Sequence, residues 1–315
     1  MDLFFLAIGS IAVGLVVGVL SGLLGIGGGT ILVPTFKLGY LMDSIACTAT
    51  SLFTIIPTSV SGAISHLRNK TCVPALGVAA GLGGAVTSPL GVWLASRSEG
   101  WMIMLAAAII IAYSAYTMLR KAFKLPAPEK GAFRANVRAA RARRAERRTA
   151  ASRGGVTRGA AAASSPAGSA CAPASGESAS EPEAQRPVSM SAKQLACGAL
   201  IGLVAGLASG YVGVGGGFLM VPLMLQFVHT PMKLTSGTSL IAVMILAVPG
   251  VVYQAFLGNV NWVVGIAVAV GSIPGAALGA KLVSWVPERT LRFIFGGLLF
   301  VAAVLLVVNQ TGLLG

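Results

Sequence analysis

GLLGIGGGTILVP, residues 22–34, occurs a second time in the chain as GYVGVGGGFLMVP, residues 210–222. Seven residues are identical between the copies and lie 188 positions apart: Gly22, Gly25, Gly27, Gly28, Gly29, Val33 and Pro34 recur as Gly210, Gly213, Gly215, Gly216, Gly217, Val221 and Pro222. Each copy lies inside a long apolar run. Three consecutive glycines with a proline nearby disfavour a continuous helix. We therefore predict a helix that is broken at the same point in two copies of one unit.

The offset of 188 continues on both sides of this stretch without a gap. Thr50-Ser51-Leu52 corresponds to Thr238-Ser239-Leu240, Gly62 corresponds to Gly250, and the glycines at 77, 83 and 91 correspond to those at 265, 271 and 279. We therefore predict two tandem repeats, residues 1–120 and 190–315, joined by a linker at residues 121–189.

The composition is that of a membrane protein. Of the 315 residues, 55% are hydrophobic and 10% are charged, whereas soluble domains contain about 25% charged residues. Apolar runs of about 20 residues, enough for a helix to cross the hydrocarbon core, recur along the chain. The N-terminal run lacks the basic region and cleavage site of a secretory signal, so we expect it to remain as a membrane helix. The predicted fold class is all-α, a polytopic membrane helix bundle.

The first repeat contains four predicted spans, at residues 3–24, 44–66, 74–96 and 101–119. The segment from Thr30 to Leu38 is too short to cross the membrane alone. Either it forms a re-entrant half-helix, or residues 3–38 fold as a hairpin of shortened helices. For the two repeats together we predict about eight spans plus two broken or re-entrant segments.

The linker differs in kind from the rest of the chain. The net charge is +14, but 15 basic and 5 acidic residues lie between Arg120 and Lys193, so most of the charge belongs to this segment. Its Ala, Ser, Pro, Gly and Arg residues cannot bury enough apolar surface to offset the entropy of ordering. We predict a disordered linker, with a basic helix at residues 133–148 as an option, and no nucleic-acid partner.

The distribution of Lys and Arg predicts the orientation. Because Arg120, Lys121 and Lys124 form the most basic flank, the positive-inside rule places linker 121–189 in the cytoplasm. Four crossings in each repeat would put the N-terminus and the Arg68–Lys70 turn on that side too. Five crossings would invert one repeat relative to the other. The basic Arg68–Lys70 turn favours four.

The two breaks are the predicted substrate site, formed by Gly27, Gly28, Gly29, Thr30, Gly215, Gly216 and Gly217. Unwound backbone in a membrane is tolerated only where it is buried in protein or lines a cavity. A half-helix that starts at either break would direct free N–H groups and the positive end of its dipole towards that cavity, which favours an anion. The alternative interpretation is that these glycines only allow close helix packing.

Hydroxyl side chains of the TSL elements are further candidates for substrate binding: Thr50, Ser51, Thr238 and Ser239. They can donate hydrogen bonds to an anion. In membrane helices, however, such hydroxyls more often bond back to a carbonyl one turn earlier, and both interpretations remain open.

Several kinds of chemistry lack candidates. Outside the linker the acidic residues are Asp2, Asp43, Glu99 and Glu288, all near predicted span ends, so no buried carboxylate relay is expected. His66 and His229 are read as interfacial or packing residues. The four cysteines, at 47, 72, 171 and 197, lack the spacing of a zinc site or a disulfide framework. We predict no catalytic residue, no metal, no cofactor and no enzyme activity.

The paired glycine motifs, each followed by a TSL element, resemble the TauE/SafE family of sulfite exporters, also called the TSUP family. The resemblance covers both repeats and omits the long basic linker, which departs from the compact pattern of the family. It implies an inner-membrane, multi-pass secondary carrier for sulfur-containing or organic anions such as sulfite, sulfoacetate, thiosulfate or sulfonates.

Two functional hypotheses follow. The first is an anion exporter that works by alternating access around the two breaks, with the small anion and the lipid bilayer as its partners. The second is a non-transporting scaffold or sensor whose basic linker contacts anionic lipid or an acidic partner. Deleting residues 128–183 would separate them, because flux should survive under the first hypothesis only. The substrate, the coupling ion, the direction of transport and the oligomeric state are left open.

Overall fold

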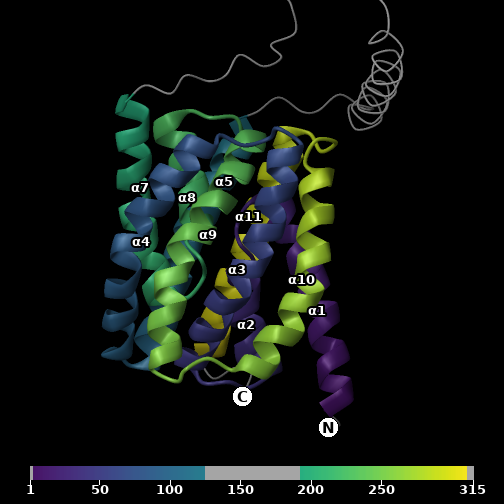
Figure 1. Cartoon of the computed structure of the whole chain (residues 1–315), viewed down its shortest axis with the longest axis vertical. Coiled ribbons are helices and arrows are strands. Elements are labelled where there is room, and N and C mark those ends of the chain that lie inside the picture. Colours follow the sequence, from purple (N-terminus) through teal and green to yellow (C-terminus); the bar gives the residue numbers. More distant parts are fainter. Residues whose placement is uncertain (1–2, 125–191, 311–315) are drawn as a thin grey trace, which may run out of the picture.

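The computed structural model describes residues 3–124 and 192–310, which form ten α-helices, one π-helical turn and no strand (Figure 1). The first half contains α1 Leu3–Leu24, α2 Gly29–Gly39, α3 Ser44–Arg68, α4 Pro74–Ser96 and α5 Gly100–Lys124. The second contains α7 Ala192–Val212, α8 Gly217–Leu223, the π-turn η2 Met224–Val228, α9 Met232–Phe256, α10 Trp262–Leu282 and α11 Glu288–Gln310. The predicted linker, with its optional helix, lies outside the described residues.

The helices form a membrane bundle, which confirms the predicted fold class. Among the described residues, seven helices are long and apolar enough to cross a bilayer: α3, α4, α5, α7, α9, α10 and α11. Helix α1 adds an eighth long helix of 22 residues that packs along α10. The remaining elements, α2 and α8 with η2, are short.

The short elements turn back into the bundle, so each half begins with a re-entrant hairpin. Tyr40, just after α2, bonds through its hydroxyl to Ser10 Oγ near the start of α1, at 2.6 Å. Helix α2 therefore returns to the side from which α1 started. In the second half, Val228 at the end of η2 packs in one cluster with Ile201 and Cys197 from the first turns of α7.

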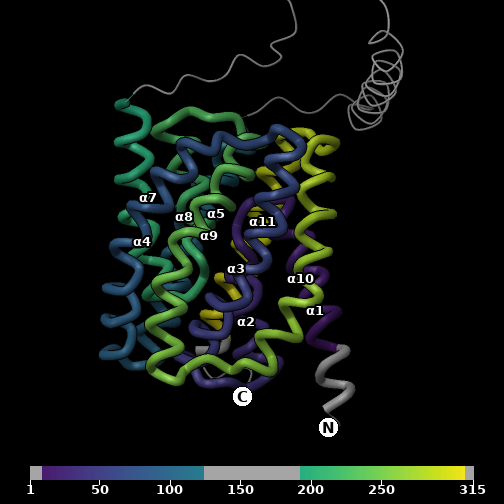
Figure 2. The backbone as a smooth tube through the Cα atoms, viewed as in Figure 1, coloured from purple at the N-terminus to yellow at the C-terminus, as the bar shows by residue number. Residues whose placement is uncertain are grey.

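The two halves have inverted orientations. Figure 2 shows α3 and α9, which pack together, running in opposite directions, with the start of α1 at one end of the bundle and the end of α5 at the other. The preference for an N-terminus on the same side as the linker was therefore wrong. The two arms of each hairpin run in opposite directions, so the hairpin adds no net crossing of the membrane. The three further helices of each half then add an odd number of crossings, which places the N-terminus and the linker on opposite sides. The Arg68–Lys70 turn does lie at the end where α5 finishes.

Helices are exchanged between the halves. Helix α1 lies parallel to α10, and α7 lies parallel to α4, in contacts where glycines face the backbone of the partner helix. In the first pair, Gly14, Gly18 and Gly22 face Val268, Ser272 and Ala276. In the second, Gly202, Gly206 and Gly210 face Ala80, Gly84 and Ser88. Small residues allow this close approach, since lipid provides no hydrophobic drive for helix association.

Candidate functional site

Each break is built from glycines in the left-handed region of backbone space. The φ angles of Gly25, Gly27 and Gly28 are 77°, 85° and 87°, and those of their copies Gly213, Gly215 and Gly216 are 75°, 86° and 68°. L side chains rarely adopt these angles, and glycine adopts them without strain. The repeated pattern of glycines is therefore required by the backbone of the break itself.

The two breaks cross each other inside the bundle. A Cβ atom added at Gly217 would lie 2.6 Å from the carbonyl oxygen of Ile26, and one added at Gly29 would clash with the carbonyl oxygen of Val214. All residues from Gly25 to Gly29 and from Gly213 to Gly217 are buried. The structure thus brings the predicted glycines together, away from lipid. Ile55 and its repeat counterpart Val243 lie against Gly27, and Ile55 also lies against Gly215.

Helix α2 starts at this crossing and presents unused donors to it. The N–H groups of Ile31 and Leu32 bond to the carbonyl of Gly28, the N-cap residue. Among the described residues, the N–H groups of Gly27, Gly28, Gly29 and Thr30 donate no backbone hydrogen bond. The N-terminal end of α2 therefore carries a partial positive charge inside the bundle. Helix α8 starts at the same crossing from the second break, but it has seven residues, compared with eleven in α2.

Four of the predicted hydroxyls hold backbone groups of the opposite half. Ser239 Oγ donates to the carbonyl of Gly25 at 2.7 Å, and Ser51 Oγ donates to the carbonyl of Gly213. We call these two bonds the cross-half clasps. Thr50 Oγ1 accepts from the N–H of Asn261 at 3.0 Å, and Thr238 Oγ1 accepts from the N–H of Val73 at 2.9 Å. A contact of these four residues with substrate remains a prediction.

Three buried hydroxyls around the first break have no hydrogen-bond partner among the described residues: Ser21 Oγ, Thr30 Oγ1 and Ser59 Oγ. Thr30 was among the predicted site residues, but the sequence reasoning did not select Ser21 or Ser59. For Ser21 a signal existed, because it recurs as Ser209. Ser59 has no such signal, since its counterpart in the second half is Ala247.

His66 is a packing residue that hydrogen-bonds to the last turn of α1, just before the first break. Its side chain is fully buried, and Nε2 lies 2.9 Å from the carbonyl oxygen of Gly22. Because a carbonyl only accepts, Nε2 carries the proton, and Nδ1 lies 2.7 Å from the Thr71 hydroxyl. The second half has Gln254 and Asn259 at the corresponding positions, joined by a hydrogen bond of 2.8 Å.

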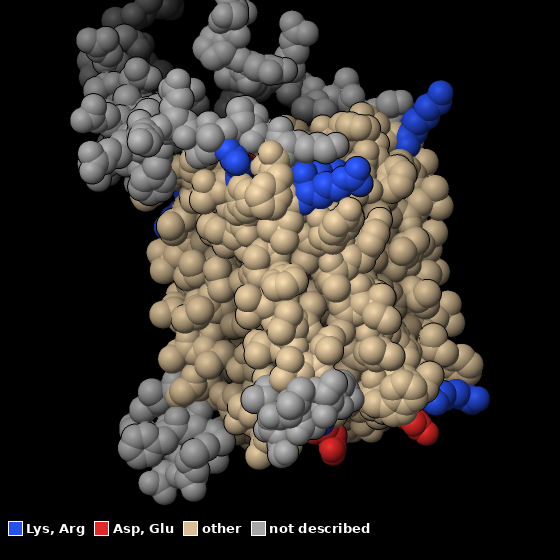
Figure 3. Space-filling view, turned by 180° about the vertical axis from the view of Figure 1, so that it is seen from behind, with Lys and Arg blue, Asp and Glu red and all other residues tan. Residues whose placement is uncertain are grey.

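Charged side chains lie at the two ends of the bundle. Of the twelve Lys and Arg residues in the described ranges, ten lie at the end where α5 finishes and α7 begins; the other two are Lys37 and Arg97. On the face seen in Figure 3, most Lys and Arg side chains gather at one end, the acidic ones lie at the other, and an uncharged band separates them.

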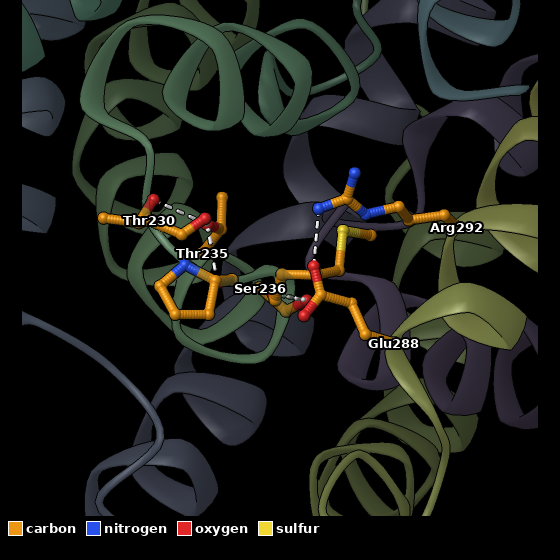
Figure 4. A network of polar contacts seen from close by, with 7 residues as sticks. Thr230, Thr235, Ser236, Glu288 and Arg292 are labelled. Carbon is orange, nitrogen blue, oxygen red and sulfur yellow. Dashed lines mark hydrogen bonds and ion pairs between the residues drawn. The ribbon is translucent and has the colours of Figure 1, made fainter. Parts of the chain in front are cut away.

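A polar network belongs to the basic end. Figure 4 shows the ion pair between Glu288 and Arg292 of α11 beside the start of α9. There, the hydroxyls of Thr230 and Thr235 lie 2.8 Å apart, and Ser236 Oγ donates to the carbonyl of Met232. Ser236 is also a neighbour of Gly25. The first turns of α9 therefore lead from the basic end to the first break.

An apolar cavity of about 520 Å³ lies between α2 and α11 and does not include the crossing. Its lining consists of Leu20, Ile31, Pro34, Thr35, Leu38, Gly39, Gly297, Leu298, Val301, Ala302 and Leu305. Among these lining residues, Thr35 alone has a polar side chain, and its hydroxyl already donates to the Ile31 carbonyl. The side chains that line this cavity therefore offer an anion no donor.

Comparison with known proteins agrees with this architecture. The family model described as "Sulfite exporter TauE/SafE" matches residues 10–306. The chain is 22% identical to the probable membrane transporter protein YunE of Bacillus subtilis, over 90% of this chain and 91% of the relative. It is 28% identical to the probable membrane transporter protein YdhB of the same organism, over 35% of this chain and 45% of the relative.

A probable membrane transporter protein of Xylella fastidiosa is 30% identical over 34% of this chain and 42% of the relative. No solved structure matches the chain significantly. The family match extends from α1 to α11 and includes both breaks. This chain therefore belongs to the sulfite exporter TauE/SafE family and is a multi-pass membrane transporter.

Proposed function

We propose that the protein is a secondary transporter that exports a small sulfur-containing or organic anion, of the sulfite, sulfoacetate or sulfonate class. The observation that carries the proposal is the crossing of two inverted helix breaks inside the bundle, where each half-helix begins with N–H groups that donate no backbone hydrogen bond within the described residues. Broken half-helices of inverted repeats form anion sites in other transporters. Membership of the sulfite exporter family supports the substrate class.

The inverted halves supply the symmetry that alternating access requires. Helix α2 leads from the crossing to one end of the bundle, and α8 with η2 leads to the other. In this structure both breaks are buried and packed on each other. Separating the breaks on one side at a time would expose the anion to one side of the membrane and then to the other.

The basic end of the bundle is proposed to face the cytoplasm, and the membrane is proposed to be the inner (plasma) membrane. Ten of the twelve Lys and Arg residues in the described ranges lie at this end, as the positive-inside rule requires. A membrane-impermeant maleimide should label a lone cysteine at Arg97→Cys in intact cells and leave one at Asn69→Cys unlabelled until the cells are opened. The reverse labelling would contradict this orientation.

The transport proposal is tested with the full chain in liposomes. Wild-type protein should carry sulfite or a sulfonate down its gradient, while empty liposomes should not. Gly28→Leu and Gly216→Leu should abolish flux, since each places a large side chain on a left-handed residue in the crossing. Wild-type protein that carries none of these anions would refute the proposal, and so would Leu variants that transport like wild type.

A further inference from the structure

The buried hydroxyls of the two halves are distributed unequally around the crossing. In α3 they continue past Ser51 with Thr54, Thr58 and Ser59. In α9 they stop at Ser239, because the corresponding positions are Ala242, Leu246 and Ala247. The repeat therefore reproduces the backbone of the break but not its polar surroundings.

Three of the six unpaired buried hydroxyls in the described residues lie around the first break. Ser21, Thr30 and Ser59 belong to α1, α2 and α3, and their relative exposures are 1%, 0% and 0%. Ser59 Oγ points at the break: it lies 3.8 Å from where a Cβ of residue 27 would be. The Cβ of Ser21 lies 3.7 Å from the corresponding point at residue 28. Buried polar groups normally have partners, so unpaired hydroxyls on three helices around one break indicate a polar ligand.

The backbone adds donors of the same kind. The free N–H groups of Gly27, Gly28, Gly29 and Thr30 lie at the N-terminal end of α2, an 11-residue helix. Hydroxyls and N–H groups can all donate to oxygen atoms of an anion. Ile55 and Val243 form an apolar wall against Gly27. The first break thus presents neutral donors beside an apolar surface.

The second break has fewer side-chain donors, although the N–H groups of Gly215, Gly216 and Phe218 also donate no backbone hydrogen bond within the described residues. The residues corresponding to Thr30 and Ser59 are Phe218 and Ala247, both fully buried, so of these three positions Ser209 alone keeps an unpaired hydroxyl among the described residues. One further unpaired hydroxyl on this side, Ser88 of α4, belongs to a residue that packs against Gly210 and Gly250. Helix α8 ends after seven residues and continues as a π-turn. These substitutions remove two of the three side-chain donors.

Resting on the proposed transport function, we propose that the first break alone forms the anion site, with Ser21, Thr30, Ser59 and the free N–H groups of α2 as its donors. Such a site selects a singly charged oxyanion with a small apolar part, such as a short alkylsulfonate. The penalty for removing an ion from water rises with the square of its charge, and no buried cation within the described residues offsets it. A doubly charged anion is therefore disfavoured.

Binding is tested separately from flux, by thermal unfolding of the purified full-length protein in detergent with increasing methanesulfonate. A ligand that binds the native state raises the midpoint in a saturable manner. Thr30→Val and Ser59→Ala should each require about tenfold more methanesulfonate for the same rise, the loss expected for one hydrogen bond to an anion. Thr30→Ser should retain wild-type behaviour because it keeps the hydroxyl.

Without ligand, Ser59→Ala should unfold at the same temperature as wild type or higher, because it removes an unpaired buried hydroxyl. Ser114→Ala is the matched control: its hydroxyl is also buried and unpaired, but it lies on α5, and its methanesulfonate response should equal that of wild type. Sulfate stabilises proteins generally. Its effect should therefore be the same in wild type and Ser59→Ala.

Two results would overturn the proposal: no saturable response of wild type to methanesulfonate, or Thr30→Val and Ser59→Ala responding as wild type does. A sulfate response that weakens in Ser59→Ala would overturn the preference for a singly charged anion. Failure of the transport proposal has a different signature, namely normal methanesulfonate binding by protein that carries no flux.

Discussion

The first break, Gly25–Gly29, and the second, Gly213–Gly217, share their backbone and differ in their surroundings. Both place three glycines at positive φ, and a cross-half clasp holds each one. Around the first lie unpaired hydroxyls of Ser21, Thr30 and Ser59, whereas apolar residues replace two of them around the second. The two breaks therefore share their backbone, and the side-chain donors of the proposed anion site lie mainly around the first.

The largest effects should be equal in the two halves. Gly25→Ala and Gly213→Ala each force a side chain onto a left-handed residue and into backbone or side-chain atoms of the opposite half. We expect each to destabilise the protein by about 2–5 kcal/mol, from strain and overpacking. Thermal unfolding midpoints and folded yield would measure this.

Gly9→Ala is the matched control for these variants. An added Cβ at Gly9 meets no atom within 4 Å, so the unfolding midpoint should not fall. If only one of the two break variants were destabilised, the two backbones would not be equivalent.

The cross-half clasps should have the next largest effect. Ser51→Ala and Ser239→Ala each leave a buried carbonyl of the opposite break without its side-chain donor. We expect each variant to lose about 1–3 kcal/mol of stability, by similar amounts. The measurement is again the unfolding midpoint, with Ser96→Ala as control, because its bond is local and exposed.

Ser21→Ala and Ser209→Ala should distinguish the two breaks. Both hydroxyls are buried and unpaired, so stability should change little in either variant. Only Ser21→Ala should raise the KM of anion flux, by about fivefold to tenfold, the loss of a hydrogen bond to an anion. Equal KM values in the two variants would show that the breaks contribute equally to binding.

The smallest effect is expected for His66→Gln, which gives the first half the residue that the second half has at the corresponding position, Gln254. A glutamine amide can donate to the carbonyl of Gly22 as Nε2 does now, so stability should change by less than about 1 kcal/mol. His66→Leu cannot donate and should be less stable than His66→Gln. If the two variants unfold at the same temperature, the bond to Gly22 has no measurable role.

The backbone of the site could be predicted from the sequence more fully than its side chains. Glycine spacing predicts a break because few other residues adopt those angles, and the repeat predicts that two breaks occur. The inversion could not be predicted, because the basic Arg68–Lys70 turn lies at the linker end for either number of crossings. The clasps join residues 162 and 214 positions apart, which no local pattern encodes.

Ser59 shows the limit of reasoning from a repeat. Residues that recur in both halves are those that both halves need, and here they form the backbone of the breaks. Because the counterpart of Ser59 is Ala247, the repeat gives no indication of this residue. What indicates Ser59 is its buried hydroxyl, which has no hydrogen-bond partner among the described residues of the structure.

The exchange of helices between the halves determines which parts of the molecule can move together. Helices α1 and α10 touch through their glycine-lined backbones, as do α4 and α7, and each pair takes one helix from either half. Backbone contacts this close leave little room for sliding. A motion that opens the crossing would therefore carry α1 with α10 and α4 with α7 as rigid bodies. The moving units would then be pairs that combine one helix from each half, and not the two sequence repeats.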